Sequence, residues 1–276
     1  MPRMSLEDHV GDVIAKGRLH AGVDAAEAAA AAGIAAPAME AFEDSGKVDG
    51  PINWTGLAGR LGLDAGKLER LAGGWQPGPV DLAAWRELRV ITTRGAHFSV
   101  NAYLVWDEVT REGALFDTGF EAAPALEIIE REAVDLRHLF ITHSHADHVA
   151  GLAAIRARHP KARLHSSMAD AALHERNRAN DFIHLGSLRI TNRSTPGHAV
   201  DGVTYVVGTW PEDAPPVAIV GDAIFAGSMG RAAGAAEEAR KAIREQILAL
   251  PPETLICPGH GPLTTVAEEK ANNPFF

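Results

Sequence analysis

The sequence predicts an α/β layered domain preceded by a small all-α domain. Before about residue 80 the chain is rich in alanine, and its apolar residues recur with helical spacing. After that point, short runs rich in β-branched residues alternate with helical segments, which is typical of strands and helices packed in layers. The segment 73–79, Gly-Gly-Trp-Gln-Pro-Gly-Pro, disfavours regular structure and predicts a linker. We therefore expect a helical domain at residues 1–78 and the α/β domain at residues 79–276.

Five short helices are expected in the first part of the chain. Asp24 can cap the second helix and Gly33 can end it, while Pro37 suits the first turn of the third. The expected helices cover residues 6–18, 25–32, 37–44, 53–61 and 64–71. This series of short helices resembles the small helix-turn-helix domain of phage-repressor type over residues 6–72.

Strands and helices are expected to alternate in the second part. The segment 136–141 is short and apolar, as a buried strand should be, and 235–248 is the clearest long helix. The expected strands cover residues 87–92, 99–106, 113–116, 136–141, 162–164, 188–192, 204–207, 217–220 and 255–257, and the expected helices cover 123–131, 149–158 and 235–248.

Composition limits the kinds of partner and compartment. The 276-residue chain has a formal net charge of −10, which argues against a nucleic-acid partner because phosphate backbones attract Lys and Arg. Cys257 is the single cysteine, so no disulfide within the chain and no Cys-rich zinc cluster can form. We see neither a signal peptide nor an apolar run of the roughly 20 residues that would span a bilayer. We therefore expect a cytoplasmic protein with no membrane partner and a small-molecule substrate.

The segment Thr142-His143-Ser144-His145-Ala146-Asp147-His148 carries the strongest chemical signal. It follows an expected buried strand and opens an expected helix, a junction that exposes side chains at the end of a sheet. Imidazole nitrogen and carboxylate oxygen are ligands that Zn²⁺ and related metals accept. The alternative interpretation is a solvated, His-rich turn.

Three more polar residues follow strand-like segments further along the chain. His198 lies in Thr-Pro-Gly-His, Asp222 follows an apolar run, and His260 lies in Pro-Gly-His-Gly-Pro. We expect the ends of these segments to meet at one rim of the sheet. Together with the first cluster they supply seven ligands, which is enough for two metal ions.

This order of motifs resembles the metallo-β-lactamase superfamily over roughly residues 88–276. A fifth motif, Asp117-Thr118-Gly119, resembles the early aspartate of that family, and we expect a structural role for it. The resemblance implies an αββα sandwich and two divalent metal ions per chain. It implies one ion on His143, His145 and His198, a second on Asp147, His148 and His260, and Asp222 as the bridge. Zinc is the expected ion, and iron or manganese accept the same ligands.

Within that superfamily, residues 221–231 and the segment after His260 resemble the glyoxalase II group, the hydroxyacylglutathione hydrolases. The resemblance implies hydrolysis of a thioester or related ester, with Asp147 as the catalytic residue that orients the attacking water and transfers protons. Arg231 takes the position of a basic residue that binds a substrate carboxylate. The resemblance is to the short bacterial members of that group, so we expect no counterpart of the C-terminal helical domain of the longer enzymes. Of the other histidines, His97, His165, His174 and His184 are candidates to line the pocket.

Other functions remain open from the sequence. A mononuclear-iron protein related to the persulfide dioxygenases would use His143, His198 and Asp222, and a lactonase is a further alternative. A DNA-binding regulator with a metal-sensing domain is suggested by the helix-turn-helix resemblance. Residues 1–80, however, hold seven basic and eleven acidic side chains. We expect this domain to serve as a homodimer interface or as a lid over the active site.

Overall fold

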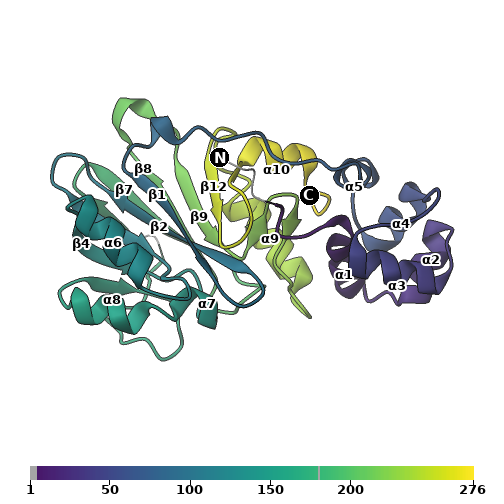
Figure 1. Ribbon diagram of the computed structural model, residues 1–276, viewed down its shortest axis with the longest axis horizontal. Helices are drawn as coiled ribbons and strands as arrows, with labels where there is room; N and C mark the ends of the chain where they lie inside the picture. Colours follow the sequence, from purple (N-terminus) through teal and green to yellow (C-terminus); the bar gives the residue numbers. More distant parts are fainter. Residues whose placement is uncertain (1–4, 180) are drawn as a thin grey trace.

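The computed structural model describes residues 5–179 and 181–276, which form a lobe of short helices beside a sandwich of two sheets (Figure 1). The helices of the lobe are α1 (Val10–Ala21), α2 (Ala25–Ala32), α3 (Ala36–Ser45), α4 (Trp54–Leu61) and α5 (Ala65–Ala72). The predicted α/β class with a preceding all-α region is confirmed.

Helix α1 begins four residues later than the sequence predicts. The backbone N–H of Asp12 donates to His9 Nδ1 at 3.1 Å, and the backbone N–H of His9 donates to Asp12 Oδ2 at 3.0 Å. This reciprocal cap fixes the start of the helix at Val10. The preceding residues 5–8 therefore form an irregular segment and not a first helical turn.

Two mixed sheets form the sandwich. The first has the strand order β1-β2-β3-β4-β5 and the second has the order β13-β12-β9-β8-β7-β6. Strands β3, β4 and β5 run parallel to one another, as do β9 and β12. The first sheet contains β1 (Leu88–Arg94), β2 (Ser99–Trp106), β3 (Glu112–Phe116), β4 (Asp135–Phe140) and β5 (Arg163–His165). The second contains β6 (Phe182–Leu185), β7 (Leu188–Ser194), β8 (Val203–Gly208), β9 (Val217–Gly221), β12 (Leu255–Pro258) and β13 (Thr264–Thr265).

Apolar cores lie between the sheets and on both outer faces. Phe116, Phe140 and Tyr205 pack between the two sheets. Helices α6 (Ala123–Arg131) and α8 (Leu152–Arg158) cover the first sheet, where Ile129 and Ile155 belong to one buried cluster. Helix α9 (Ala236–Gln246) covers the second sheet, and α10 (Val266–Asn272) lies beside the helical lobe. The architecture is thus helix, sheet, sheet, helix.

One predicted helix is interrupted. The sequence predicts a single helix over 149–158, whereas the structure has α7 (Ala146–Val149) and then α8. The chain turns at Gly151, whose backbone N–H donates to Gly119 O at 3.3 Å. The turn ties the start of α8 to the loop that follows β3.

The helical lobe packs directly against the end of the chain. One buried cluster contains Ile14, Leu57 and Leu68 of the lobe together with Phe275 and residues of β8, β9 and β12. Backbone contacts join the same surfaces, since Asp64 N donates to Pro274 O at 2.8 Å. Residues 73–79 form neither helix nor strand, as predicted, but the domain boundary at 78/79 stays a prediction because the two regions share a core.

None of the helices within residues 5–179 and 181–276 is long and apolar enough to span a lipid bilayer.

Candidate metal centre

The seven predicted ligands come together at one rim of the sandwich. His143 and its neighbours follow β4, His198 follows β7, Asp222 directly follows β9, and His260 follows β12. Parallel strands β9 and β12 end side by side, which brings the loops that carry Asp222 and His260 together. The expectation of a shared rim is therefore confirmed.

His143, His145 and His198 form the first group of potential ligands. His143 Nε2 lies 3.1 Å from His145 Nδ1, and His198 Nε2 lies 3.0 Å from the same atom. The three nitrogens all lie within 4.8 Å of one another, as atoms that share one ion must. This is the set that the sequence predicts for the first metal ion.

Asp147, His148 and His260 form a second group next to the first. Asp147 Oδ2 lies 3.5 Å from His148 Nε2 and 3.3 Å from His260 Nε2. His260 is oriented by the backbone, because its Nδ1 lies 2.6 Å from the carbonyl oxygen of Ser99. The group matches the set predicted for the second ion.

Asp222 lies between the two groups. Its Oδ2 is 3.4 Å from His198 Nε2 and 3.3 Å from His260 Nε2, one histidine of each group. Its Oδ1 is 3.3 Å from His148 Nε2. This is the position that a bridging carboxylate requires.

Asp117 supports the centre from beneath. Its carboxylate accepts hydrogen bonds from Thr142 N at 2.8 Å and Thr142 Oγ1 at 2.7 Å, and it lies 2.8 Å from His148 Nδ1. A carboxylate on the far nitrogen of an imidazole fixes its tautomer and directs the other nitrogen toward a metal. The geometry agrees with the structural role predicted for Asp117.

The electrostatics of the cluster suit a cation. Burial disfavours a charged imidazole, and it lowers the pKa of His143 to about 2. At His148 the carboxylates of Asp117 and Asp222 outweigh the burial and raise the pKa to about 10, and at His260 the carboxylates of Asp147 and Asp222 raise it to about 11. The carboxylates therefore favour positive charge at these two imidazoles, and a bound metal ion would supply such charge.

Two buried atoms in the cluster lack a hydrogen-bond partner among the residues that the structure describes. They are His148 Nε2 and Asp222 Oδ1, which lie 3.3 Å apart but make no hydrogen bond with each other. Buried polar atoms normally have a hydrogen-bond partner. Imidazole nitrogens and carboxylate oxygens that lack one are suited to bind a divalent metal ion. The chemistry of the residues thus agrees with the binding of divalent metal ions.

Comparison with known proteins decides the family. A model of the metallo-beta-lactamase superfamily matches residues 95–260. The chain belongs to the metallo-β-lactamase superfamily. The matched range covers the sandwich from β2 to β12 and all seven cluster residues, and it leaves β1, β13 and the helical lobe outside. Members of this superfamily bind divalent metals, and the chain is a metal enzyme of that type.

Relatives in this superfamily have different activities. Human mitochondrial persulfide dioxygenase ETHE1 is 31% identical over 62% of this chain and 69% of its own length. Hydroxyacylglutathione hydrolase GloC of Haemophilus influenzae is 28% identical over 65% of this chain and 93% of its own length. Among solved structures, TTHA1623 in a di-iron-bound form is 26% identical with a TM-score of 0.52, and covers 67% of this chain and 99% of that chain.

Arg231 lies at the edge of the metallo-β-lactamase centre. Its side chain is exposed, and its carbonyl oxygen lies 3.2 Å from His198 Nδ1, which positions that imidazole. A role of its guanidinium in substrate binding stays a prediction.

One part of the site was not visible in the sequence. Residues 5–7 and the loop 94–99 line an open cleft of about 670 Å³ beside His260. The Phe98 ring lies 5.5 Å from the His260 ring, and His97, one of the four candidate pocket histidines, also lines the cleft. Glu7 was missed because the sequence assigns it to the first helix, and nothing in its neighbours signals a contact with residues more than 200 positions away.

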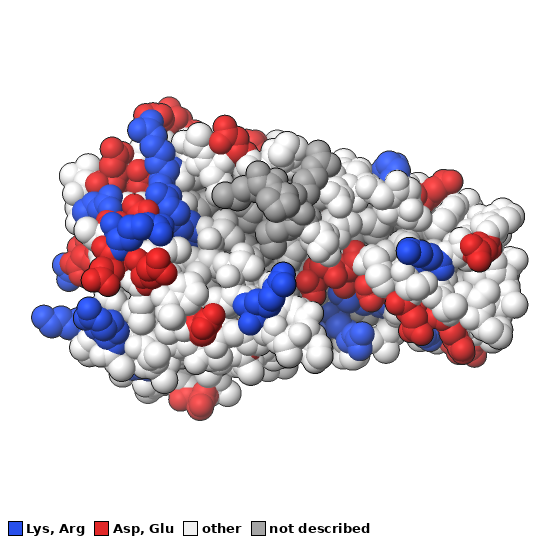
Figure 2. Space-filling model, viewed as in Figure 1, with Lys and Arg blue, Asp and Glu red and all other residues white. Residues whose placement is uncertain are grey.

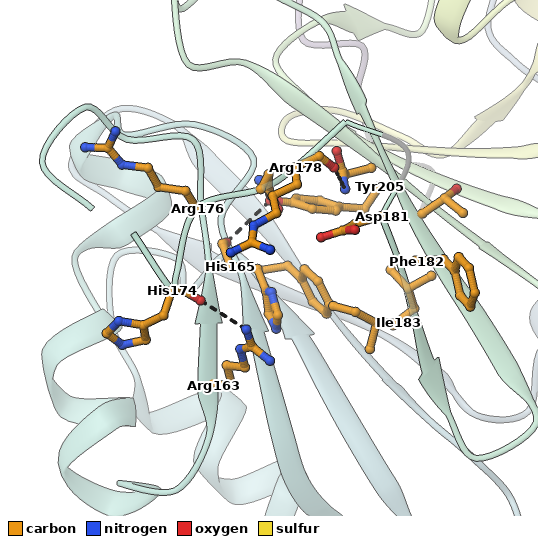
Figure 3. Close-up of a pocket in the computed structure, with 14 residues that line it drawn as sticks. Arg163, His165, His174, Arg176, Arg178, Asp181, Phe182, Ile183 and Tyr205 are labelled. Atoms are coloured by element: carbon orange, nitrogen blue, oxygen red, sulfur yellow. Dashed lines mark hydrogen bonds between the residues drawn. The ribbon is translucent and has the colours of Figure 1, made fainter. Parts of the chain in front are cut away.

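A second cavity, of about 190 Å³, lies between the edge strands β5 and β6 (Figure 3). His165 lines it, and Arg163 and Arg178 reach into it from opposite sides (Figure 3). Arg163 donates to the carbonyl oxygen of His174 at 3.2 Å. None of the seven cluster residues is among its lining residues, so this cavity is separate from the superfamily's metal centre.

Proposed function

We propose that the chain is a dinuclear metal-dependent hydrolase that cleaves a thioester or a related ester. The observation that carries the proposal is the position of Asp222 between two complete groups of potential ligands. The similarity to GloC, which extends over 93% of that hydrolase, supports the same reaction class.

The residues present assign the parts of the reaction. Divalent ions held by the two groups would polarise the scissile carbonyl and lower the pKa of a bound water toward neutrality. Asp147 contacts His260 at the rim and is half-buried, so its carboxylate can orient the attacking water and pass a proton to the leaving group. A thiolate leaving group needs little protonation, so thioesters suit this site. Arg231 would bind a substrate carboxylate.

The persulfide dioxygenase relative motivates the alternative activity. A mononuclear iron site would need only His143, His198 and Asp222, and it would leave Asp147, His148 and His260 without a task. The persulfide dioxygenases retain these three residues as well. Their ligand atoms lie within 4.8 Å of one another here, which is the arrangement that a second ion would need. A lactonase would use the same two-ion arrangement, and only substrate tests separate it from a thioesterase.

The proposal is tested by metal content and turnover together. We expect about two zinc ions per chain in protein expressed without added metal, with hydrolysis of S-lactoylglutathione that is lost in Asp222→Ala. Arg193→Gln, outside the cluster, serves as the matched control and should keep both properties. One iron per chain, no ester hydrolysis, and oxygen uptake with a persulfide would overturn the proposal in favour of the dioxygenase.

A further inference from the structure

The segment Ser5–Asp8, which precedes the first helix of the lobe, runs along the metal centre; we name it the N-terminal strap. It passes Gly261, the residue after His260. A Cβ atom at Gly261 would lie 3.0 Å from Glu7 N and 3.3 Å from Glu7 Cβ. Gly261 also has a φ of +73°, a conformation that other residues rarely adopt. The strap and the His260 loop therefore fit together through a glycine contact.

A buried ion pair anchors the strap. Asp8 Oδ2 binds Lys16 Nζ of α1 at 2.5 Å, and both side chains are only 9% exposed. Lys16 Nζ also donates to Met229 O at 2.9 Å and lies 5.2 Å from the centre of the Phe225 ring. Phe225 and Met229 belong to the hairpin of β10 (Ile224–Phe225) and β11 (Ser228–Met229), which begins two residues after Asp222. One network thus connects the lobe, the strap and the metal loop.

The cleft between the strap and the loop 94–99 carries charge of both signs. Glu7 of the strap and Arg94 of the loop both line it, together with the imidazole of His97. Phe98, 46% exposed, adds an apolar surface next to His260. The cleft volume of about 670 Å³ is typical of sites that hold small molecules.

The carboxylate of Glu7 is available to a ligand. Its side chain makes no ion pair within the described part of the chain, and the nearest cation on the strap network, Lys16, is engaged by Asp8. Burial raises the pKa of Glu7, and the charges of His260 and Asp222 act on it because the strap lies against the loop that carries His260. An acidic group next to a reaction centre favours a cationic group on the substrate by charge complementarity.

We infer that the N-terminal strap forms one wall of the substrate site and that Glu7 binds a cationic, ammonium-type group on the substrate. The helical lobe, which lies outside the superfamily match, then acts as a specificity element. This inference rests on the proposed hydrolase function for its substrate class. Glu7 is a substrate-positioning residue, and its effect should appear in binding and in KM more than in kcat.

The test compares a cationic thioester with its neutral isostere, acetylthiocholine with S-(3,3-dimethylbutyl) thioacetate, on the zinc-loaded protein. We expect kcat/KM to favour the cationic ester by about tenfold, the range of one charge-assisted contact of about 1.4 kcal/mol. Glu7→Gln should remove the preference through KM, and Glu7→Lys should reverse it. Glu40→Gln, on the exposed side of α3, is the matched control and should keep the preference.

A second measurement separates this inference from the proposed function. Calorimetry of the product thiol, thiocholine, against 3,3-dimethylbutanethiol reports the same preference without any turnover. If neither ester is hydrolysed but thiocholine binds more tightly in a manner that depends on Glu7, the hydrolase proposal fails and the strap inference stands. The inference would be overturned if the ratio of the affinity for the cationic thiol to that for the neutral thiol were the same in wild type, Glu7→Gln and Glu7→Lys.

Discussion

At the scale of single residues, His148 contacts both Asp117, which supports the metal centre, and Asp222, one of the potential metal ligands. Its Nδ1 lies 2.8 Å from Asp117 Oδ2, and its Nε2 points toward Asp222 Oδ1 at 3.3 Å. Gly259 makes this arrangement possible, since a Cβ atom there would lie 2.2 Å from Asp222 Oδ1. The ligand geometry therefore depends on residues that touch no metal themselves.

Replacing Asp117 with Asn should weaken the centre without unfolding the protein. The amide loses the negative charge that orients His148, so we expect metal affinity and turnover to fall by roughly 10- to 100-fold. Competition with a zinc chelator measures the affinity. Asp135→Asn, at the exposed start of β4, is the control that should change neither. Wild-type affinity in Asp117→Asn would contradict the assigned support role.

At the scale of secondary-structure elements, α10 carries a buried carboxylate that holds three segments together. Glu269 Oε2 accepts hydrogen bonds from Gly227 N at 3.0 Å and Asn273 Nδ2 at 2.8 Å, and its Oε1 accepts one from Thr264 Oγ1 at 2.8 Å. Burial raises the pKa of Glu269 to about 7, although these hydrogen bonds oppose the rise. The carboxyl group of Glu269, in the helix next to the helical lobe, therefore titrates near neutral pH.

The raised pKa of Glu269 predicts a pH-dependent stability. Because the folded-state pKa lies above the unfolded value of 4.5, the contribution is fully present below about pH 4.5 and is lost as the pH rises through about 7. Glu269→Gln keeps a hydrogen-bonding amide and removes the titration. We expect the free energy of unfolding of wild type, relative to this variant, to fall by about 3 kcal/mol between pH 5 and pH 9.

Urea unfolding of both proteins across this pH range measures the difference. Glu268→Gln on the same helix is the matched control, and its difference from wild type should lack this transition near pH 7. A constant difference between wild type and Glu269→Gln across the range would show that Glu269 does not titrate there.

At the scale of the whole molecule, the helical lobe and the sandwich behave as one packed unit. A single buried cluster spans both regions, and α9 and α10 lie between them (Figure 1). Charge on the lobe is mixed: on the face that Figure 2 shows, acidic and basic residues alternate in small groups without a continuous basic surface. This distribution does not favour binding of DNA phosphates. A homodimer through the lobe stays a prediction.

The shared core predicts that metal binding stabilises the lobe as well as the sandwich. A ligand present at 100 times its Kd should raise the free energy of global unfolding by roughly 2.7 kcal/mol. This free energy corresponds to a factor of about 100 in the unfolding equilibrium. When zinc is added, amide hydrogen exchange at core positions of α4, such as Leu57 and Leu61, and of β9 should therefore slow by about that factor. If zinc slowed exchange of the β9 amides but left exchange of the α4 amides unchanged, the lobe would unfold independently of the sandwich.

The sequence is informative where one local pattern suffices. The caps Asp24, Asn53 and Asp64 act within their own helical turn, and the helices they start lie where the sequence predicts them. The sequence does not predict strand β6 (Phe182–Leu185), because this short segment combines apolar and polar residues. It forms a strand by pairing with β7 at the edge of the sheet. Helix α10 was missed because it has only seven residues, and Thr265 caps it directly after a two-residue strand.

The sequence by itself determined the fold class, the family motifs and the identity of the seven potential ligands, because these depend on local periodicity and on residue types in a fixed order. Only the tertiary structure decided that Asp222 lies between two groups and that Glu7 lies against the loop that carries His260. These juxtapositions join residues far apart in the chain. They follow from how the strands pair and how the lobe packs, which no local pattern encodes.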